Sequence, residues 1–465
     1  MSMEKNIVII GAGLAGTLIC NRLVTKCNVT LLEVGDENVF RYPQIKFTQK
    51  VFASVKTFCQ GGGGTTNLWH NGLIPVFARD VTLDAFKEVL TQAEDYHDKA
   101  AENLFWLGNP YSNEYEKITS EMNLLVEKTG VFSDGVDCLL YPKKFTKLVV
   151  TTAVDSFYAV SDIEFSSVEK RIASVSYRIG KTKYSVDADV VIISAGTLGS
   201  PLLVKKVLSS LGCSGETVGL GLADHPLGFV GKVKMKKSVN RDMKLLSVSD
   251  RGDYECRTGI RVKSECGKYT GCAFLRPALT MGNKLSIYKY KSLLGASSGM
   301  DRIRNMFSWK LFHPDILAEI YSHLFGANIP GRIYNILFLF EQKRGKSSVS
   351  YDDSGLVVDW SITDEELRIC REMIKKLQGM LAGISDEINL ETDITDDWLW
   401  SAAHHSGTIS LGDNEDDIVD KDLKLKACDN VYVCDGSIIQ EHSYANTGLT
   451  IGSLAMRLAE RVCRE

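Results

Sequence analysis

The segment NIVIIGAGLAGTLICNRL, residues 6–23, decides the fold class. Its first part, Ile7–Ile10, is a short apolar run typical of a buried strand, and apolar residues then recur at helical intervals. Gly11, Gly13 and Gly16 lie between the two patterns in G-x-G-x-x-G spacing. This order of strand, glycine turn and helix predicts a Rossmann-like α/β fold with a parallel sheet.

The same segment predicts a binding site for a dinucleotide. Gly11 permits the tight turn, Gly13 lets a pyrophosphate approach the backbone, and Gly16 packs the helix against the strand. The free N–H groups at the start of the helix, with Leu14 and Ala15 in the turn, suit phosphates. A second strand, NVTLLEV, contains Glu33, placed where a carboxylate hydrogen-bonds a ribose 2′-hydroxyl. The acid favours FAD or NAD over NADP.

Composition describes an ordinary globular protein. The chain has 465 residues, with 44% hydrophobic and 24% charged, a length that predicts two or three domains. The net charge of −4 excludes a strong field for nucleic acid or anionic lipid. The twelve cysteines form no C-x-x-C pair, so we predict no metal site, and scattered thiols suit a reducing compartment. With no apolar stretch of transmembrane length, the sequence predicts a cytoplasmic protein.

Five motifs, spread from residue 6 to residue 462, recur in the order of one known family. After the first glycine motif come QGGGGTTNLWHNG (60–72), ADVVIISAGTLGSPLLV (188–204), GLGLADHPLG (219–228), and HHSGTISLGDN (404–414) followed by NVYVCDGSIIQEHSYANTGLTIGSLAMRLAERV (430–462). With these motifs the chain resembles the glucose–methanol–choline (GMC) family of flavin oxidoreductases.

The resemblance implies an FAD-binding Rossmann-like domain interleaved with a substrate domain, which is built on an antiparallel sheet with helices. The FAD-binding domain would comprise 1–80, 145–232 and 396–465, and the substrate-binding domain 81–144 and 233–395. From the residues themselves, the segment 165–194 alternates as a β-meander. A hairpin pattern and a helix start at Thr363 follow within 340–367.

The resemblance also implies the residues that bind FAD. They are Gly11, Gly13, Leu14, Ala15, Gly16, Glu33, Gly62, Gly63, Gly64, Thr65, Thr66, Asn67, Ala195, Gly196, Asp435, Gly436, Asn446, Thr447, Gly448 and Leu449. The glycine run would let backbone N–H groups approach the flavin, whereas a flexible surface loop is the alternative.

The same comparison bears on how the flavin is attached. Some sugar-oxidising members of the family carry a histidine in the glycine-rich segment that bonds covalently to the flavin. The corresponding positions here are Thr66, Asn67 and Leu68, and the nearest histidine is His70. We therefore expect non-covalent FAD, and a link through His70 stays open.

The family's catalytic pair falls on His404, the first residue of H-x-x-G-T, and on Asn446, eleven residues after Asp435. His404 would be the base that takes the hydroxyl proton, since a neutral imidazole suits this task near pH 7. Asn446 would hydrogen-bond the substrate oxygen and could also cap the helix that follows. His405 is the alternative base in a register shifted by one residue.

Two further histidines receive structural interpretations. His442 lies in a polar turn and is expected at the surface, and His225 is expected to tether a domain junction.

The implied activity is oxidation of an alcohol to a carbonyl, with a sugar, a glycoside or a secondary-metabolite alcohol as substrate. A non-redox lyase and a non-catalytic flavoprotein on the same scaffold are the alternatives. The sequence leaves open the electron acceptor, oxygen or another, and the oligomeric state. Residues 300–340 are rich in aromatic and apolar side chains, which indicates helices over the active site, a subunit contact, or a surface for lipid.

Overall fold

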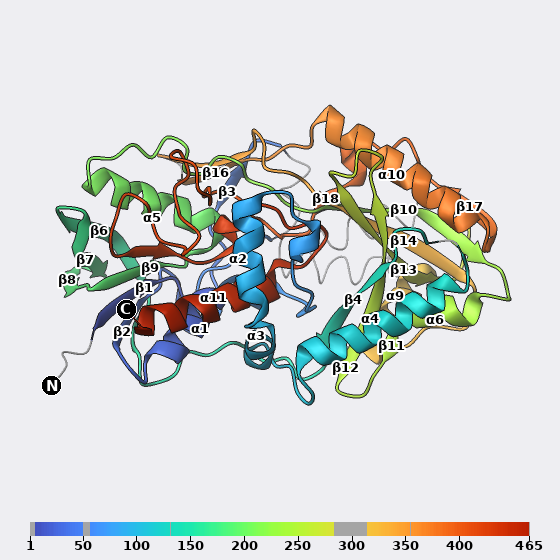
Figure 1. The fold of residues 1–465 in the computed structure, drawn as a ribbon, viewed down its shortest axis with the longest axis horizontal. Helices are drawn as coiled ribbons and strands as arrows, with labels where there is room; N and C mark the ends of the chain where they lie inside the picture. Colours follow the sequence, from blue (N-terminus) through green and yellow to red (C-terminus); the bar gives the residue numbers. More distant parts are fainter. Residues whose placement is uncertain (1–4, 50–55, 131, 283–313, 354, 465) are drawn as a thin grey trace.

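The computed structural model describes residues 5–49, 56–130, 132–282, 314–353 and 355–464. Its helices and strands divide between a parallel sheet at the left of Figure 1 and an antiparallel sheet at the right.

The parallel sheet has five strands in the order β19-β9-β1-β2-β5. Their bounds are β1 Asn6–Ile10, β2 Asn28–Leu32, β5 Asp155–Phe157, β9 Val190–Ile193 and β19 Val431–Val433. Every neighbouring pair is parallel. The central strands β1 and β9 are apolar and buried, as expected for strands that other elements cover on both faces. The glycine segment therefore folds as predicted, into a strand followed by the helix α1 (Leu14–Leu23).

Long helices cover the parallel sheet. The C-terminal helix α11 (Thr447–Arg464) packs against α1 and against the short helices α2 (Asp84–Glu94) and α3 (His97–Asn103), as Figure 1 shows. Helix α5 (Gly196–Ser210) begins directly after β9. The predicted meander is a separate antiparallel sheet of β6 (Val160–Val168), β7 (Arg171–Ile179) and β8 (Thr182–Asp187).

The antiparallel sheet has eight strands and supplies the wall that faces the parallel sheet's carboxyl edge. Its strands are β4 Val136–Pro142, β10 Pro226–Met235, β11 Ser249–Asp250, β12 Tyr254–Lys263, β13 Thr270–Ala278, β14 Ile333–Phe340, β17 Ser385–Leu390 and β18 Trp400–Ser401. Its helices are α4 Tyr111–Glu127, α6 Asn240–Ser247, α9 Pro314–Phe325 and α10 Asp364–Ala382. α10 begins at the predicted place, where Thr363 and Glu366 form a capping box.

Strand pairing crosses the expected domain edges. β10 begins at Pro226, inside the segment 145–232 assigned to the FAD-binding domain, and it belongs to the antiparallel sheet. The hairpin of β15 (Ser348–Asp352) and β16 (Gly355–Asp359) pairs with β3 (Ile45–Phe47) of the first segment. The division into two interleaved domains stays a prediction, and two of the pairings between strands cross the predicted domain boundaries.

The aromatic and apolar segment 300–340 and the search for membrane-spanning stretches were two further subjects of the sequence analysis. Of residues 300–340, those from 300 to 313 lie outside the described residues, while α9 packs against β13 and leaves Leu317 and Phe325 exposed. Across the described ranges, the helices lack the length and apolar character needed to cross a bilayer. All twelve cysteines are free thiols.

Candidate active site

A cavity of about 930 Å³ lies between the two sheets. It is at the upper end of the range of roughly 300–1,000 Å³ that ligand sites occupy. It is lined by the carboxyl ends of β1, β2 and β9 on one side and by β4, β10, β12, β13 and β14 on the other. The edge at the carboxyl ends of parallel strands is where α/β sheets bind their ligands.

Most residues of the predicted site line this cavity. They are Gly11, Gly13, Leu14, Ala15, Glu33, Gly64, Thr65, Thr66, Ala195, Gly196, His404, Asp435, Gly436, Asn446, Thr447 and Gly448. His70 and His405 line it too. The structure does not bring Gly16, Gly62, Gly63, Asn67 or Leu449 to the cavity wall.

The glycine turn has three positions with three different constraints. Gly11 has φ +112°, and a Cβ there would lie 2.3 Å from the carbonyl oxygen of Ser194. A Cβ on Gly16 would lie 1.9 Å from the carbonyl oxygen of Gly11, so Gly16 serves packing and not the cavity. A Cβ on Gly13 would meet no atom closer than 4.0 Å, so this side of the turn is open toward the cavity.

Glu33 ties this turn to the glycine-rich segment. Its buried carboxylate accepts hydrogen bonds from the backbone N–H groups of Ala12 (2.8 Å), Gly35 (2.9 Å) and Gly61 (3.1 Å). Burial raises the pKa of Glu33, and these N–H groups oppose the shift because they favour the ionised form. Because Glu33 also lines the cavity, a ribose hydroxyl would meet a carboxylate that is already held in place.

The glycine-rich segment is folded, so the flexible-loop alternative is wrong. Gly63 has φ +84° and Gly64 φ +53°, and the latter begins the 3-10 helix η2 (Gly64–Leu68). The amide of Asn67 donates to the carbonyl oxygens of Gly62 (3.1 Å) and Gly64 (2.8 Å). Asn67, expected against the cofactor, therefore uses its side-chain N–H groups to hold the segment's own backbone.

Asp435 joins the third and fifth motifs. Its buried carboxylate accepts hydrogen bonds from the backbone N–H of Gly196 (2.9 Å), from the backbone N–H of Ser437 (2.8 Å) and from the hydroxyl of Ser200. Burial raises its pKa. This carboxylate fixes the start of α5 beside the turn that follows β19, so both line the same cavity. Leu449, by contrast, is fully buried in the core.

A chain of hydrogen bonds defines the protonation of His404. Its Nδ1 lies 2.9 Å from Nδ1 of His225, and Nε2 of His225 lies 2.7 Å from the carbonyl oxygen of Ser443. A carbonyl only accepts, so Nε2 of His225 carries the proton. His225 is neutral, since burial holds its pKa well below the usual range, and its Nδ1 therefore accepts from His404. Nε2 of His404 is left with a lone pair.

The environment keeps His404 neutral as well. Burial lowers its pKa to about 4, and the charges of His405 and His70 act in the same direction, whereas Asp224 opposes them. The backbone N–H of His404 donates to Asp224 at 2.9 Å. His404 follows Ala403, a non-glycine residue with φ +60°, a strained conformation of the kind that clusters at functional sites.

Asp224 is a site residue that the sequence did not single out beyond the family's D-H-P stretch. It is fully buried, and it also accepts from the backbone N–H of His225 at 2.7 Å and from the hydroxyl of Ser401. Burial alone would raise its pKa, but the ring of His405, with Nδ1 3.2 Å from the carboxylate, holds the pKa at about 2. His405 is thus paired with Asp224.

The expectation that His442 lies at the surface is wrong. Its side chain is fully buried, and its ring stacks on His225 with the centroids 3.9 Å apart and an interplanar angle of 16°. Burial lowers its pKa to about 3. The polar turn is buried because its side chains have distant partners. His225, expected at a domain junction, lies at the centre of the histidine cluster.

The segment 441–446 is held almost residue by residue. The carboxylate of Glu441 accepts from the N–H of Thr82 (2.6 Å) and pairs with Lys343 (2.9 Å). The N–H of Ser443 donates to Glu341 at 3.1 Å. The amide of Asn446 donates to the carbonyl oxygen of Gly72 at 3.1 Å. This framework fixes Asn446 at the cavity wall.

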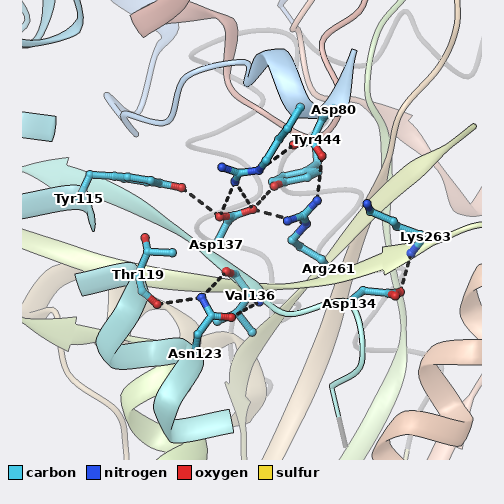
Figure 2. Close-up of polar contacts among 11 residues, drawn as sticks. Asp80, Tyr115, Thr119, Asn123, Asp134, Val136, Asp137, Arg261, Lys263 and Tyr444 are labelled. Carbon is cyan, nitrogen blue, oxygen red and sulfur yellow. Dashed lines mark hydrogen bonds and ion pairs between the residues drawn. The ribbon is translucent and has the colours of Figure 1, made fainter. Parts of the chain in front are cut away.

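Tyr444 anchors the same segment to the antiparallel sheet, as Figure 2 shows. Its hydroxyl donates to the buried carboxylate of Asp137, which also accepts from Tyr115 (3.1 Å) and pairs with Arg261 (3.5 Å). Arg261 in turn pairs with Asp80 at 2.7 Å. Arg79, 3.1 Å from Asp137, supplies the second positive charge, so that two carboxylates and two guanidiniums balance in a cluster that anchors this segment.

Three comparisons with known proteins find similar sequences and similar folds. Residues 344–455 match the family model described as GMC oxidoreductase. Pyridoxine 4-oxidase of Microbacterium luteolum is 30% identical over 143 residues, a match that spans 26% of this chain and only 28% of that relative.

Two solved structures share the whole fold. They are the pyridoxine 4-oxidase from Mesorbium loti (TM-score 0.60, 16% identity) and an FAD-dependent oxidoreductase from Chaetomium thermophilum (TM-score 0.59, 14% identity). Each comparison covers 99% of both chains. The C-terminal region, residues 344–455, therefore matches the GMC oxidoreductase family, and the whole chain shares the fold of these two oxidoreductases.

Proposed function

We propose that the protein is an FAD-dependent oxidoreductase that oxidises a CH–OH group to a carbonyl, with His404 as the base. The observation that supports this most directly is the chain from Ser443 through His225 to His404. It leaves a lone pair on Nε2 of a neutral imidazole that lines the cavity. The names of the similar proteins, pyridoxine 4-oxidase and FAD-dependent oxidoreductase, support a redox reaction on this fold.

The cavity has features that suit FAD. The open side of Gly13 and the N-terminus of α1 would hold the pyrophosphate, and Glu33 would meet a ribose. Thr447 and Gly448, at the start of α11, would lie at the ring end of the cofactor. Bound FAD supplies the two-electron acceptor for the alcohol's hydride. We propose non-covalent binding.

Two side chains would handle the reacting hydroxyl. Nε2 of His404 would accept its proton, which requires the neutral ring that burial provides. Asn446 has two amide N–H bonds, and one is used by Gly72. The second would donate to the substrate oxygen and orient the hydroxyl toward His404. A positioned base of this kind contributes roughly 10²–10⁴-fold to rate.

An anaerobic screen of alcohols and sugars, followed by flavin absorbance, tests the proposal. Bleaching of the flavin by an alcohol is the expected result. A lyase that uses the same histidine would consume substrate while the flavin stays oxidised, and a non-catalytic flavoprotein would do neither. A sugar or glycoside is the substrate class first tested, and reoxidation by air or by a dye then identifies the acceptor.

A further inference from the structure

The wall of the cavity opposite the nucleotide-binding half is mostly apolar, and two arginines are its charged side chains. Its side chains from the antiparallel sheet and β18 are Leu139, Tyr141, Leu227, Arg257, Phe274, Arg276, Leu337, Leu339 and Trp400. An apolar pocket with a few placed polar groups is typical of a small-molecule site, in which the polar groups determine specificity. The arginines are therefore the residues of this wall that a substrate's polar group would meet.

Arg257 lacks the partner that a buried guanidinium requires. Only 5% of the residue is exposed, and its Nη1 is buried without a hydrogen-bond partner. Its positive charge acts on Glu255, but without an ion-pair contact in the described part of the chain. Burying an unpaired charge is costly, so such a group is normally matched by an opposite charge. The missing charge points to a ligand.

The carboxylate of Glu255 interacts electrostatically with Arg257 but does not fill this role. Glu255 lies two residues earlier on β12, and burial raises its pKa although the positive charge of Arg257 opposes the shift. A Cβ on Gly326 would lie 2.3 Å from Oε1 of Glu255, so this carboxylate contacts the end of α9. Arg276 adds a second positive charge to the same wall and has a contact of its own.

Arg257 lines the same cavity as the predicted catalytic pair. Its guanidinium carbon is 6.0 Å from the ring centroid of Tyr141. A Cβ placed on Gly72 would be 2.8 Å from both the Tyr141 ring and Nδ2 of Asn446. Tyr141 therefore lies near both Arg257 and Asn446. Arg257, Asn446 and His404 line the same cavity, so a molecule whose hydroxyl meets Asn446 and His404 would share that cavity with Arg257.

We propose that Arg257 binds a carboxylate on the substrate, so that the enzyme oxidises a small hydroxy acid. A planar guanidinium matches a carboxylate through two parallel hydrogen bonds, and the apolar wall would accept the carbon skeleton between the two ends. This inference rests on the proposed alcohol oxidation, because it names the substrate class of the same site.

The test compares hydroxy acids with their uncharged amides on the flavin-loaded protein. The probes are 4-(hydroxymethyl)benzoate, 6-hydroxyhexanoate and their amides, with a hydroxyalkyl phosphate as the other anion. Anaerobic flavin reduction gives the rate for each. A second measurement needs no reaction, since benzoate and hexanoate can be titrated while the flavin spectrum reports binding. We expect each acid to react faster than its amide, and the carboxylates to bind more tightly than the phosphate.

Variants assign the preference to Arg257. In Arg257→Gln the ratio of acid to amide rates should fall toward one, and the dissociation constant of benzoate should rise about 10- to 100-fold. Arg257→Lys should retain part of the preference, because it keeps the charge but not the fork. The matched control is Arg251→Gln, on a half-buried arginine that is paired with Glu121 and does not line the cavity, and it should change neither quantity. FAD content per chain reports correct folding of each variant.

The outcomes separate the two proposals. Reduction by amides without any preference for acids would overturn the carboxylate site and leave the alcohol oxidation standing. Binding of benzoate that depends on Arg257, without flavin reduction by any alcohol, would support the site and contradict the oxidation. A preference that survives in Arg257→Gln would overturn the role of Arg257, and tighter binding of the phosphate would overturn the carboxylate. If Arg257→Gln does not fold, the ratio of acid to amide rates in the wild-type protein and in Arg257→Lys tests the carboxylate site instead.

Discussion

His225 and His404 are joined through their Nδ1 atoms at 2.9 Å, although 179 residues separate them in the chain. Because His225 donates its own proton to Ser443, the bond permits only one tautomer of His404. The stacked ring of His442 covers His225 on one face. The arrangement presents the proposed base in its reactive form before any substrate binds.

Removing the acceptor should disturb that tautomer. In His225→Leu we expect His404 to lose its preference for the tautomer with the proton on Nδ1. A neutral hydrogen bond contributes roughly 0.5–1.5 kcal/mol to that preference, so flavin reduction should slow by up to about tenfold. His225→Asn keeps an oxygen near the position of Nδ1 and should retain most of the rate. The ¹⁵N spectrum of histidine-labelled protein checks the cause, since a protonated Nδ1 on His404 should be present in wild type and His225→Asn and mixed in His225→Leu. An unchanged tautomer in His225→Leu would contradict the relay.

The pH profile should reflect a buried histidine. An unperturbed imidazole titrates near 6.5, whereas burial lowers the pKa of His404 to about 4. The base is active when deprotonated, so the rate of anaerobic flavin reduction should be flat between about pH 6 and 8 and should fall as the pH drops toward about 4. Burial is the main cause of the lowered pKa; among the neighbours, Asp224 raises it, and His405 and His70 lower it further. A rate that already falls through pH 6.5 would mean that the ring is solvated.

Two glycine substitutions should fail for different reasons. Gly13→Val puts a branched side chain into open space at the turn, so FAD content should fall while the melting temperature of the apoprotein stays near wild type. Gly16→Ala places a methyl group 1.9 Å from the carbonyl oxygen of Gly11, so the apoprotein itself should be destabilised. Thermal unfolding of both apoproteins and flavin content distinguish them. Full FAD content in Gly13→Val would exclude this turn from the site.

Acid precipitation tests how the flavin is held. The positions where some relatives carry a linking histidine are Thr66, Asn67 and Leu68, so FAD should be released into the supernatant. Absorbance of the supernatant after precipitation measures it. His70 lines the cavity, and flavin that remains with the pellet in wild type but not in His70→Ala would show a covalent link through this residue.

Features encoded by neighbouring residues were predicted correctly from the sequence, whereas features that depend on contacts between distant residues were predicted wrongly. The strand, turn and helix of residues 6–23 are encoded by neighbouring side chains and form as predicted. The meander predicted over 165–194 forms over 160–187, and residues 190–193 join the parallel sheet instead. His442 was misplaced because a polar turn resembles a surface turn unless its partners are known. The partners lie elsewhere in the chain: His442 stacks on His225, Ser443 donates to Glu341, and Tyr444 donates to Asp137.

The same reason explains what the sequence missed in the site. Asn67 belongs to a motif that passes the cavity, but its amide is used by Gly62 and Gly64. Arg257 stands in a strand without a recognisable motif, and only the fold brings it to the wall of the cavity. His404, Asn446 and the alternative base His405 all line the cavity, so their catalytic roles stay predictions.

The central claim is that His404, and not its neighbour His405, takes the hydroxyl proton. It is tested most directly by the rate of anaerobic flavin reduction in His404→Ala and His405→Ala, each loaded with FAD. We predict a loss of roughly 10²–10⁴-fold in His404→Ala with near-normal FAD content. His405, paired with Asp224, should affect the rate much less. A rate that is lost in His405→Ala and kept in His404→Ala would contradict the account.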